Sequence, residues 1–244
     1  MAASPHRFPH FSDAYRKRWV DAGFWSDRTL HDFFDETVEA RPDDVAVITA
    51  ERQFTFAELK HSSDFLAAGL LGAGVSRGDI VAVQLPNWVE FCLFQIALSR
   101  IGAVIQPTHL AFRERELSSL FSFCGTDFAV TAGLFGDRQY ADALRDIRSE
   151  LPRLRGLIIV RGQAQGEGEI SFDTLIEDGK AHLGRLDDVV TDPDDVFYLN
   201  FTSGTEGNPK GFLHSHNSLI STFAAMSKAM ANLTPGAVNL ACSP

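Results

Sequence analysis

The eleven residues from Phe201 to Gly211 combine side chains that suit phosphate binding. They read Phe-Thr-Ser-Gly-Thr-Glu-Gly-Asn-Pro-Lys-Gly and contain three hydroxyls, three glycines and one lysine. Glycines let backbone N–H groups turn toward one anion, hydroxyls donate to phosphate oxygens, and a lysine adds mobile positive charge. The pattern is not a Walker A loop, because Pro209 stands where that motif has its second glycine. The composition therefore favours a loop that grips a polyphosphate.

A plain surface turn is the competing interpretation of this segment. Loops rich in glycine, serine and threonine are in general more often turns than binding sites. Here the order of the residues is more specific, since the segment directly follows an apolar strand and ends in Pro-Lys-Gly. The binding loop is therefore the preferred interpretation.

Short apolar runs alternate with amphipathic segments along the chain, and these elements must position the loop. Thr29 with Asp32 and Thr55 with Glu58 match capping boxes, so each pair predicts the start of a helix. Asn87 is expected to cap a further helix. The other expected helices cover residues 113–123, 140–150 and 217–230, and the expected strands cover 80–85, 103–106, 128–131, 157–160, 196–200 and 238–242, with a hairpin over 46–56. This alternation predicts an α/β fold with parallel sheets and helices on both faces.

Composition shifts suggest three parts of the chain. Residues 1–28 form a polar N-terminal arm, residues 29–190 carry the α/β subdomains, and residues 191–244 begin a next subdomain that contains the candidate loop. The acidic, proline-containing segment 184–195 is expected to be a solvated linker. Its three close aspartates lack the glycine and the distal glutamate of an EF-hand, so no metal ligands are predicted.

Composition also excludes several classes of function. The chain has 244 residues, 45% of them hydrophobic, and a net charge of −10. Because a nucleic-acid or anionic-membrane binder usually presents a basic face, neither partner is expected. No apolar run is long enough to span a bilayer, and the N-terminus lacks the apolar core of a secretory signal. Three widely spaced cysteines favour a reducing, cytoplasmic location without disulfides. Two of them, Cys92 and Cys124, lie in apolar runs and are expected in the core.

Three segments together resemble the adenylate-forming enzymes, which include acyl-CoA synthetases, luciferases and peptide-synthetase adenylation domains. Thr202–Gly211 resembles their phosphate-binding signature, Thr-Ser-Gly-Thr-Thr-Gly-x-Pro-Lys-Gly. Phe54–Leu59 is similar to an early Thr-Tyr-x-Glu-Leu motif, and Leu98–Pro107 is similar to a segment that reads Ala-Gly-Ala-x-x-x-Pro. The resemblance starts near Trp25 and implies the N-terminal part of an acyl-CoA synthetase-like fold.

The resemblance implies a two-step reaction. A carboxylic acid attacks the α-phosphate of MgATP to give an acyl-adenylate and pyrophosphate, and the acyl group then passes to coenzyme A. The implied acid is a fatty, alicyclic or aryl acid. An amino-acid adenylation domain and a non-catalytic module that associates with itself are the alternatives. The implied phosphate-binding residues are Thr202, Ser203, Gly204, Thr205, Glu206, Gly207, Lys210 and Gly211.

Two departures and one further residue affect this expectation. Glu206 stands where the family signature has a second threonine, and a carboxylate there should repel a triphosphate. The chain stops at Pro244, before the later motifs of the family, so it is expected to be an incomplete part that is inactive alone. His216 matches a histidine common after the signature, which implies a place near the acyl or nucleotide site. Capping of the next helix by the Ser215-His216-Asn217 segment is the favoured alternative.

Overall fold

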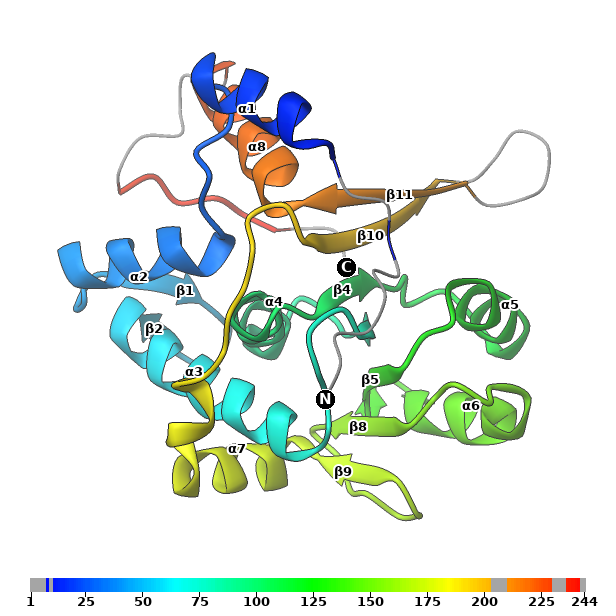
Figure 1. The fold of residues 1–244 in the computed structure, drawn as a ribbon. Coiled ribbons are helices and arrows are strands. Elements are labelled where there is room, and N and C mark those ends of the chain that lie inside the picture. Colours follow the sequence, from blue (N-terminus) through cyan, green and yellow to red (C-terminus); the bar gives the residue numbers. More distant parts are fainter. Residues whose placement is uncertain (1–7, 9–10, 203–209, 230–235, 242–244) are drawn as a thin grey trace.

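A seven-stranded sheet forms the centre of the protein (Figure 1). Its strands follow the order β11-β10-β4-β3-β5-β8-β9, and all neighbours are parallel except the edge pair β10 and β11. The strands are β3 (Ile80–Gln84), β4 (Val104–Pro107), β5 (Phe128–Ala132), β8 (Gly156–Val160), β9 (Glu169–Ser171), β10 (Val196–Thr202) and β11 (Lys210–Ser215). This computed structural model describes residues 8, 11–202, 210–229 and 236–241.

Helices cover both faces of the sheet, which confirms the expected fold class. One face carries α3 (Phe56–Gly72), α4 (Val89–Ile101) and α7 (Phe172–Ala181), and the other carries α5 (Glu114–Cys124) and α6 (Tyr140–Ile147). Successive side chains of a strand point to opposite faces. In β3, Val81 and Val83 accordingly point into the core under α3, α4 and α7, whereas Ala82 points into the core under α5 and α6.

The remaining elements lie around this layered body. They are α1 (Asp13–Asp21), α2 (Leu30–Ala40), α8 (His216–Ala229), the hairpins β1 (Val45–Ile48) with β2 (Gln53–Thr55) and β6 (Leu134–Phe135) with β7 (Arg138–Gln139), and two 3-10 turns at Arg148–Glu150 and Leu183–Leu186. Among the described residues, no helix combines the length and the hydropathy that a bilayer crossing requires. The division at residue 191 stays a prediction, and β10 and β11 extend the same sheet as the strands before them.

Both expected capping boxes are confirmed. The Thr29 hydroxyl accepts a hydrogen bond from the Asp32 amide, and the Asp32 carboxylate accepts one from the Thr29 amide. Thr55 and Glu58 form the same reciprocal pair at the start of α3. Each capping box supplies acceptors for two backbone N–H groups that have no partner within the helix. Because this role requires particular residue types three positions apart, the start of each helix could be predicted from the sequence.

Three expectations differ from the structure. Trp88, not Asn87, is the N-cap of α4, and the Asn87 amide instead donates to the carbonyl oxygen of Ala241 at 3.4 Å. Residues 238–241 are not a strand, because no described strand pairs with them; Cys242 lies outside the described residues. The strand β9 and the helix α7 were not expected at all. A three-residue strand has little pattern, and Gly179 inside α7 weakens the helical signal.

The acidic segment before β10 is also more ordered than a solvated linker. Asp195 accepts two hydrogen bonds from the guanidinium group of Arg77, at 2.7 and 2.8 Å. The Asp194 side chain is 10% exposed and accepts a hydrogen bond from the Asn217 amide at 2.9 Å. These aspartates therefore tie α8 and the loop before β3 to the start of β10.

Candidate functional site

Three of the candidate phosphate-binding residues, Thr202, Lys210 and Gly211, lie on the paired strands β10 and β11. Thr202 ends β10 and pairs with Lys210, which begins β11. Since β10 runs parallel to β4 and β3, its carboxyl end shares an edge of the sheet with theirs. Ligands of open α/β sheets bind outside this edge. The predicted residues Ser203, Gly204, Thr205, Glu206 and Gly207 lie outside the described residues.

Local packing explains the glycine at the end of the signature. Gly211 pairs with Phe201 across the hairpin, and a Cβ atom at Gly211 would lie 2.9 Å from the ring of Phe201. A larger residue would therefore have to displace that ring. Lys210 beside it is exposed, so its ammonium group is accessible to an anion at the carboxyl edge.

His216 lies at the opposite end of β11 from Lys210. Six strand residues separate the two ends by roughly 15–20 Å, so the structure does not bring them together. His216 is 1% exposed, and its ring stacks on Phe197 with centroids 4.6 Å apart. Its Nδ1 accepts a hydrogen bond from the Leu30 amide at 3.2 Å. Burial lowers the pKa of His216 to about 3, so the ring is neutral near pH 7.

The capping interpretation of this region is supported, with Ser215 as the capping residue. The Ser215 hydroxyl accepts a hydrogen bond from the amide of Ser218 at 3.2 Å. His216 and Asn217 form the first turn of α8 and are fully buried. His216 therefore joins the hairpin to the start of α2. A role for it at the acyl or nucleotide site stays untested.

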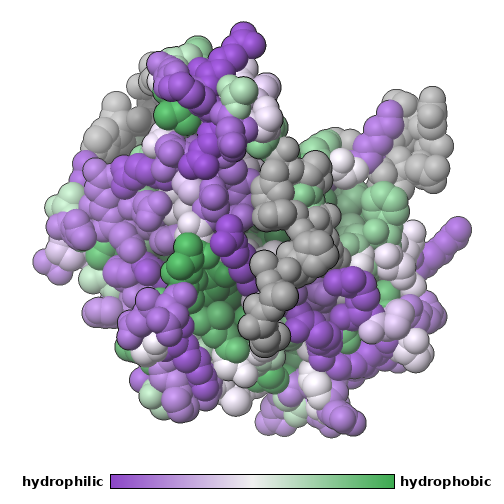
Figure 2. Space-filling view, viewed as in Figure 1, coloured by the Kyte–Doolittle hydropathy of each residue, from purple (hydrophilic) through white to green (hydrophobic). Residues whose placement is uncertain are grey.

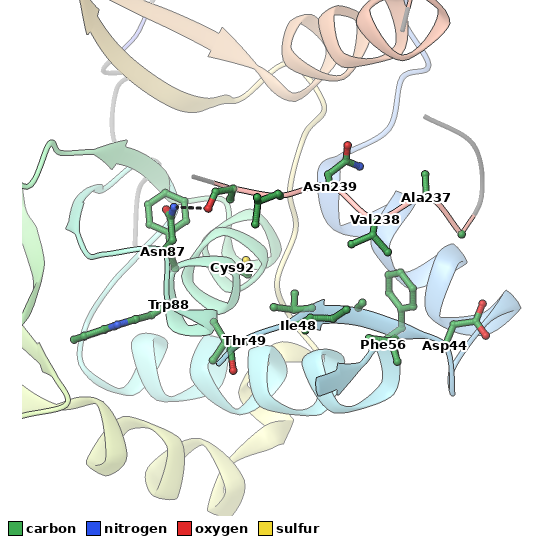
Figure 3. Close-up of a pocket in the computed structure, with 18 of the residues that line it drawn as sticks. Asp44, Ile48, Thr49, Phe56, Asn87, Trp88, Cys92, Ala237, Val238 and Asn239 are labelled. Carbon is green, nitrogen blue, oxygen red and sulfur yellow. Dashed lines mark hydrogen bonds between the residues drawn. The ribbon is translucent and has the colours of Figure 1, made fainter. Parts of the chain in front are cut away.

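A cavity of about 710 Å³ opens near the start of α4 (Figure 3). It lies between the β1–β2 hairpin, the first turn of α4 and residues 236–241, and Val238 points toward Ile48 and Phe56. On the face of the molecule drawn in Figure 2, a hydrophobic hollow is framed by hydrophilic residues. The lining residues are Arg41, Asp44, Val45, Ala46, Val47, Ile48, Thr49, Phe56, Asn87, Trp88, Val89, Phe91, Cys92, Gly236, Ala237, Val238, Asn239, Leu240 and Ala241. Because α4 follows β3, the cavity lies near the carboxyl edge of the sheet.

Several cavity residues were expected to be core residues. Trp88, Phe91 and Cys92 are only partly buried and face this space. Spacing along α4 identified an apolar face but could not tell a packed core from the wall of a cavity. Burial raises the pKa of the Cys92 thiol, so the thiol stays protonated near pH 7.

An ion pair fixes the aromatic wall of the cavity, and no sequence signal pointed to it. The Glu90 carboxylate accepts hydrogen bonds from Arg161 at 2.7 and 3.1 Å, and the Arg161 guanidinium lies 4.2 Å from the centre of the Trp88 ring. Glu90 is 8% exposed and raises the pKa of Arg161. The two charges are 71 residues apart in sequence, so helical spacing could not reveal the pair.

The amino-acid sequence is similar to those of several known enzymes. The chain is similar to the medium-chain fatty-acid–CoA ligase of Escherichia coli K12, at 31% identity over 92% of the chain and 39% of the relative. It is similar to a salicylyl-CoA synthase/salicylate adenylyltransferase of a Streptomyces species, at 30% identity over 82% of the chain and 36% of that protein.

Solved structures show the same relationship. The apo structure of MbtA from Mycobacterium smegmatis matches with a TM-score of 0.78 and 28% identity, over 91% of the chain and 40% of that protein. The chain thus spans about two fifths of the length of these relatives. The family model described as AMP-binding enzyme matches residues 34–244. With most of its length matched in this way, the protein belongs to the AMP-binding enzyme family.

Proposed function

We propose that this chain carries the phosphate-gripping part of an ATP-dependent acid–thiol ligase. The observation that carries the proposal is the pairing of Thr202 with Lys210 at the carboxyl edge of a parallel sheet. Threonine and lysine are residue types that can donate hydrogen bonds to phosphate oxygens, and the backbone register makes these two residues neighbours on adjacent strands. The full set proposed for this role is Thr202, Ser203, Gly204, Thr205, Glu206, Gly207, Lys210 and Gly211.

The proposed chemistry is acyl activation on the α-phosphate of ATP. The substrate carboxylate attacks that phosphorus, the bond to the bridging oxygen breaks, and pyrophosphate leaves with its electron pair. Lys210 offsets charge on the leaving group, and the hairpin holds it in place. Mg²⁺ is expected to arrive on the nucleotide, because this ion is usually held by phosphate oxygens and one or two carboxylates. Coenzyme A is the proposed thiol that takes the acyl group in the second step.

The cavity beside α4 suits the apolar part of a small carboxylic acid. Ile48, Phe56 and Val238 give it apolar walls, and it shares the carboxyl edge of the sheet with the hairpin. We place fatty, alicyclic and aryl acids ahead of amino acids, since most of the lining side chains are apolar and Asp44 is the one carboxylate among the residues that line the cavity. The reaction is proposed to take place in the cytoplasm, because thiols stay reduced in that compartment.

Trapping of the acyl-adenylate tests this proposal. The purified chain would be incubated with MgATP and single acids from a panel of octanoate, cyclohexanecarboxylate, benzoate and phenylalanine, and acyl-AMP measured by mass spectrometry. The same panel would be run with the chain extended to the length of its relatives. The proposal predicts acyl-AMP from the extended protein with an apolar acid. Adenylate formation from phenylalanine alone would favour the amino-acid alternative.

A further inference from the structure

The β10–β11 hairpin has few registered backbone pairs with the rest of the sheet. One registered pair, Tyr198 with Ile105, links β10 to β4, whereas β3 has four registered pairs with each of its neighbours. The strand β11 is the edge of the sheet and pairs with β10 alone among the described strands. Val196, Phe197 and Leu199 of β10 are buried in the core, so this packing and the root of the hairpin, where β11 runs into α8, together set its position.

Asn217 makes the contacts at this root. It is completely buried, and its side chain uses both functional atoms. Its Oδ1 accepts a hydrogen bond from the Asp27 amide at 3.0 Å, and its Nδ2 donates to the Asp194 carboxylate at 2.9 Å. Its own amide donates to the carbonyl of Pro193 at 3.0 Å. One side chain thus joins three segments that are far apart in sequence: the N-terminal arm, the start of β10 and the start of α8.

The partners of Asn217 are themselves held in fixed positions. Asp27 has a φ of +57°, a conformation that residues other than glycine seldom adopt, so its amide is aimed by a strained turn. Arg16 of α1 pairs with the carboxylate of Asp27 at 2.5 Å and with that of Asp194 at 3.2 Å. The charged side chains of the arm therefore surround the same junction.

We infer that Asn217 is a positioning residue: it fixes the root of the β10–β11 hairpin and thereby sets the places of Thr202 and Lys210 at the other end. This inference rests on the proposed function for the link to ATP. The neighbouring contact from the Leu30 amide to His216 acts in the same direction, since it holds the first turn of α8 against α2. The N-terminal arm then contributes to phosphate binding without touching the nucleotide.

Hydrogen exchange and MgATP titration on matched variants test the inference. Asn217→Ala removes both side-chain hydrogen bonds. We expect amide exchange in residues 196–202 and 210–215 to become about tenfold faster and the Kd for MgATP to rise about tenfold. Leu144→Ala is the control, because it destabilises the completely buried core beneath α6 and should leave the MgATP affinity unchanged.

Exchanging the hydrogen-bond donor and acceptor between Asn217 and Asp194 distinguishes a positioning role of Asn217 from a general effect on stability. Asn217→Asp sets two carboxylates against each other at Asp194 and should weaken MgATP binding further. Adding Asp194→Asn restores a donor opposite an acceptor, so binding should return to within about threefold of the original chain. Unchanged affinity in Asn217→Ala, or a double variant no better than Asn217→Asp, would overturn the inference.

The same experiments also distinguish an error in the proposed function from an error in the role of Asn217. If the original chain and its extended form bound no MgATP, the phosphate role would be lost, and hydrogen exchange alone would decide the structural part. Faster exchange in Asn217→Ala, confined to the hairpin, would then still show that Asn217 holds it. Unchanged exchange would overturn the inference on its own.

Discussion

Thr202 and Lys210 are eight positions apart in sequence, yet they are direct neighbours across the β10–β11 ladder. The run of glycines, hydroxyls and one lysine after an apolar strand could be read from the sequence, and the phosphate-binding role inferred from it stays a proposal. The role of Asn217 could not be read, since its partners Asp27 and Asp194 are distant in sequence. Long-range hydrogen bonds leave no periodic signal.

Glu206 offers a direct electrostatic test of the phosphate-binding interpretation. A carboxylate beside a triphosphate repels it, so Glu206→Gln should tighten MgATP binding several-fold, the equivalent of about 1 kcal/mol for one charge near the surface. The change should shrink as salt is added. Calorimetric titration at two salt concentrations measures both effects. Glu177→Gln is the control on α7, where the carboxylate pairs with Lys180. Weaker binding by Glu206→Gln would mean that this side chain helps to hold the metal–nucleotide complex.

His216 makes the stability of the protein depend on pH. Its folded-state pKa of about 3 lies below the ordinary value of 6.5, so the unfolded chain binds a proton that the folded chain does not. This contribution to stability is complete above about pH 6.5 and is lost as the pH falls toward 3. The expected slope is at most about 1.4 kcal/mol of unfolding free energy per pH unit.

Denaturant unfolding at several pH values between 4 and 8 measures that slope. The non-titrating variant His216→Gln should be less stable at pH 8 and should have a flatter pH dependence below pH 6.5. If the two profiles ran parallel over this range, His216 would not be the titrating group.

At the scale of elements, the packing of α7 on α3 is a feature that could not be predicted from the sequence. These helices approach so closely that a Cβ atom at Gly179 would lie 1.7 Å from the carbonyl oxygen of Phe65. Glycine lowers the helix propensity of a segment. Gly179, which allows the close packing, therefore also makes α7 hard to predict from the sequence. By contrast, α2 and α3 were predicted from local capping boxes, and the strands β3, β5 and β8 from apolar runs. Elements with a local sequence pattern could be predicted, whereas features that arise from packing between elements could not.

The close approach of α3 and α7 predicts a large effect of one added methyl group. Gly179→Ala should lower the free energy of unfolding by about 1–3 kcal/mol, because the backbones must separate to admit it. The matched control is Gly184→Ala, where the nearest atom would be 3.7 Å from the new Cβ. Urea denaturation of both variants measures the difference. Equal stabilities would show that the helices are packed less closely than described.

At the scale of the whole molecule, apolar side chains remain exposed next to the cavity. Val238 is 80% exposed and Leu240 is 86% exposed, and Ile48 faces the same cavity at 56%. Adjacent apolar residues on a protein surface favour association with another apolar surface. Self-association therefore stays an alternative function for this chain.

We expect the purified chain to associate with itself in a concentration-dependent manner. Light scattering after size exclusion should give a mass above 26.8 kDa that rises with concentration. The double variant Val238→Asp with Leu240→Asp should shift the equilibrium toward the monomer, because a charge is costly to bury in an apolar contact. A monomer of the original chain at every concentration would remove this alternative.

Titration calorimetry of MgATP into the original chain and into Lys210→Ala tests the central claim most directly. The claim predicts binding by the original chain and a loss of roughly tenfold or more in Lys210→Ala, since a charge-assisted contact to phosphate is removed. Lys180→Ala, which changes an exposed lysine on α7, should bind like the original chain. Equal MgATP affinity in all three proteins would contradict the claim that the β10–β11 hairpin grips the phosphates.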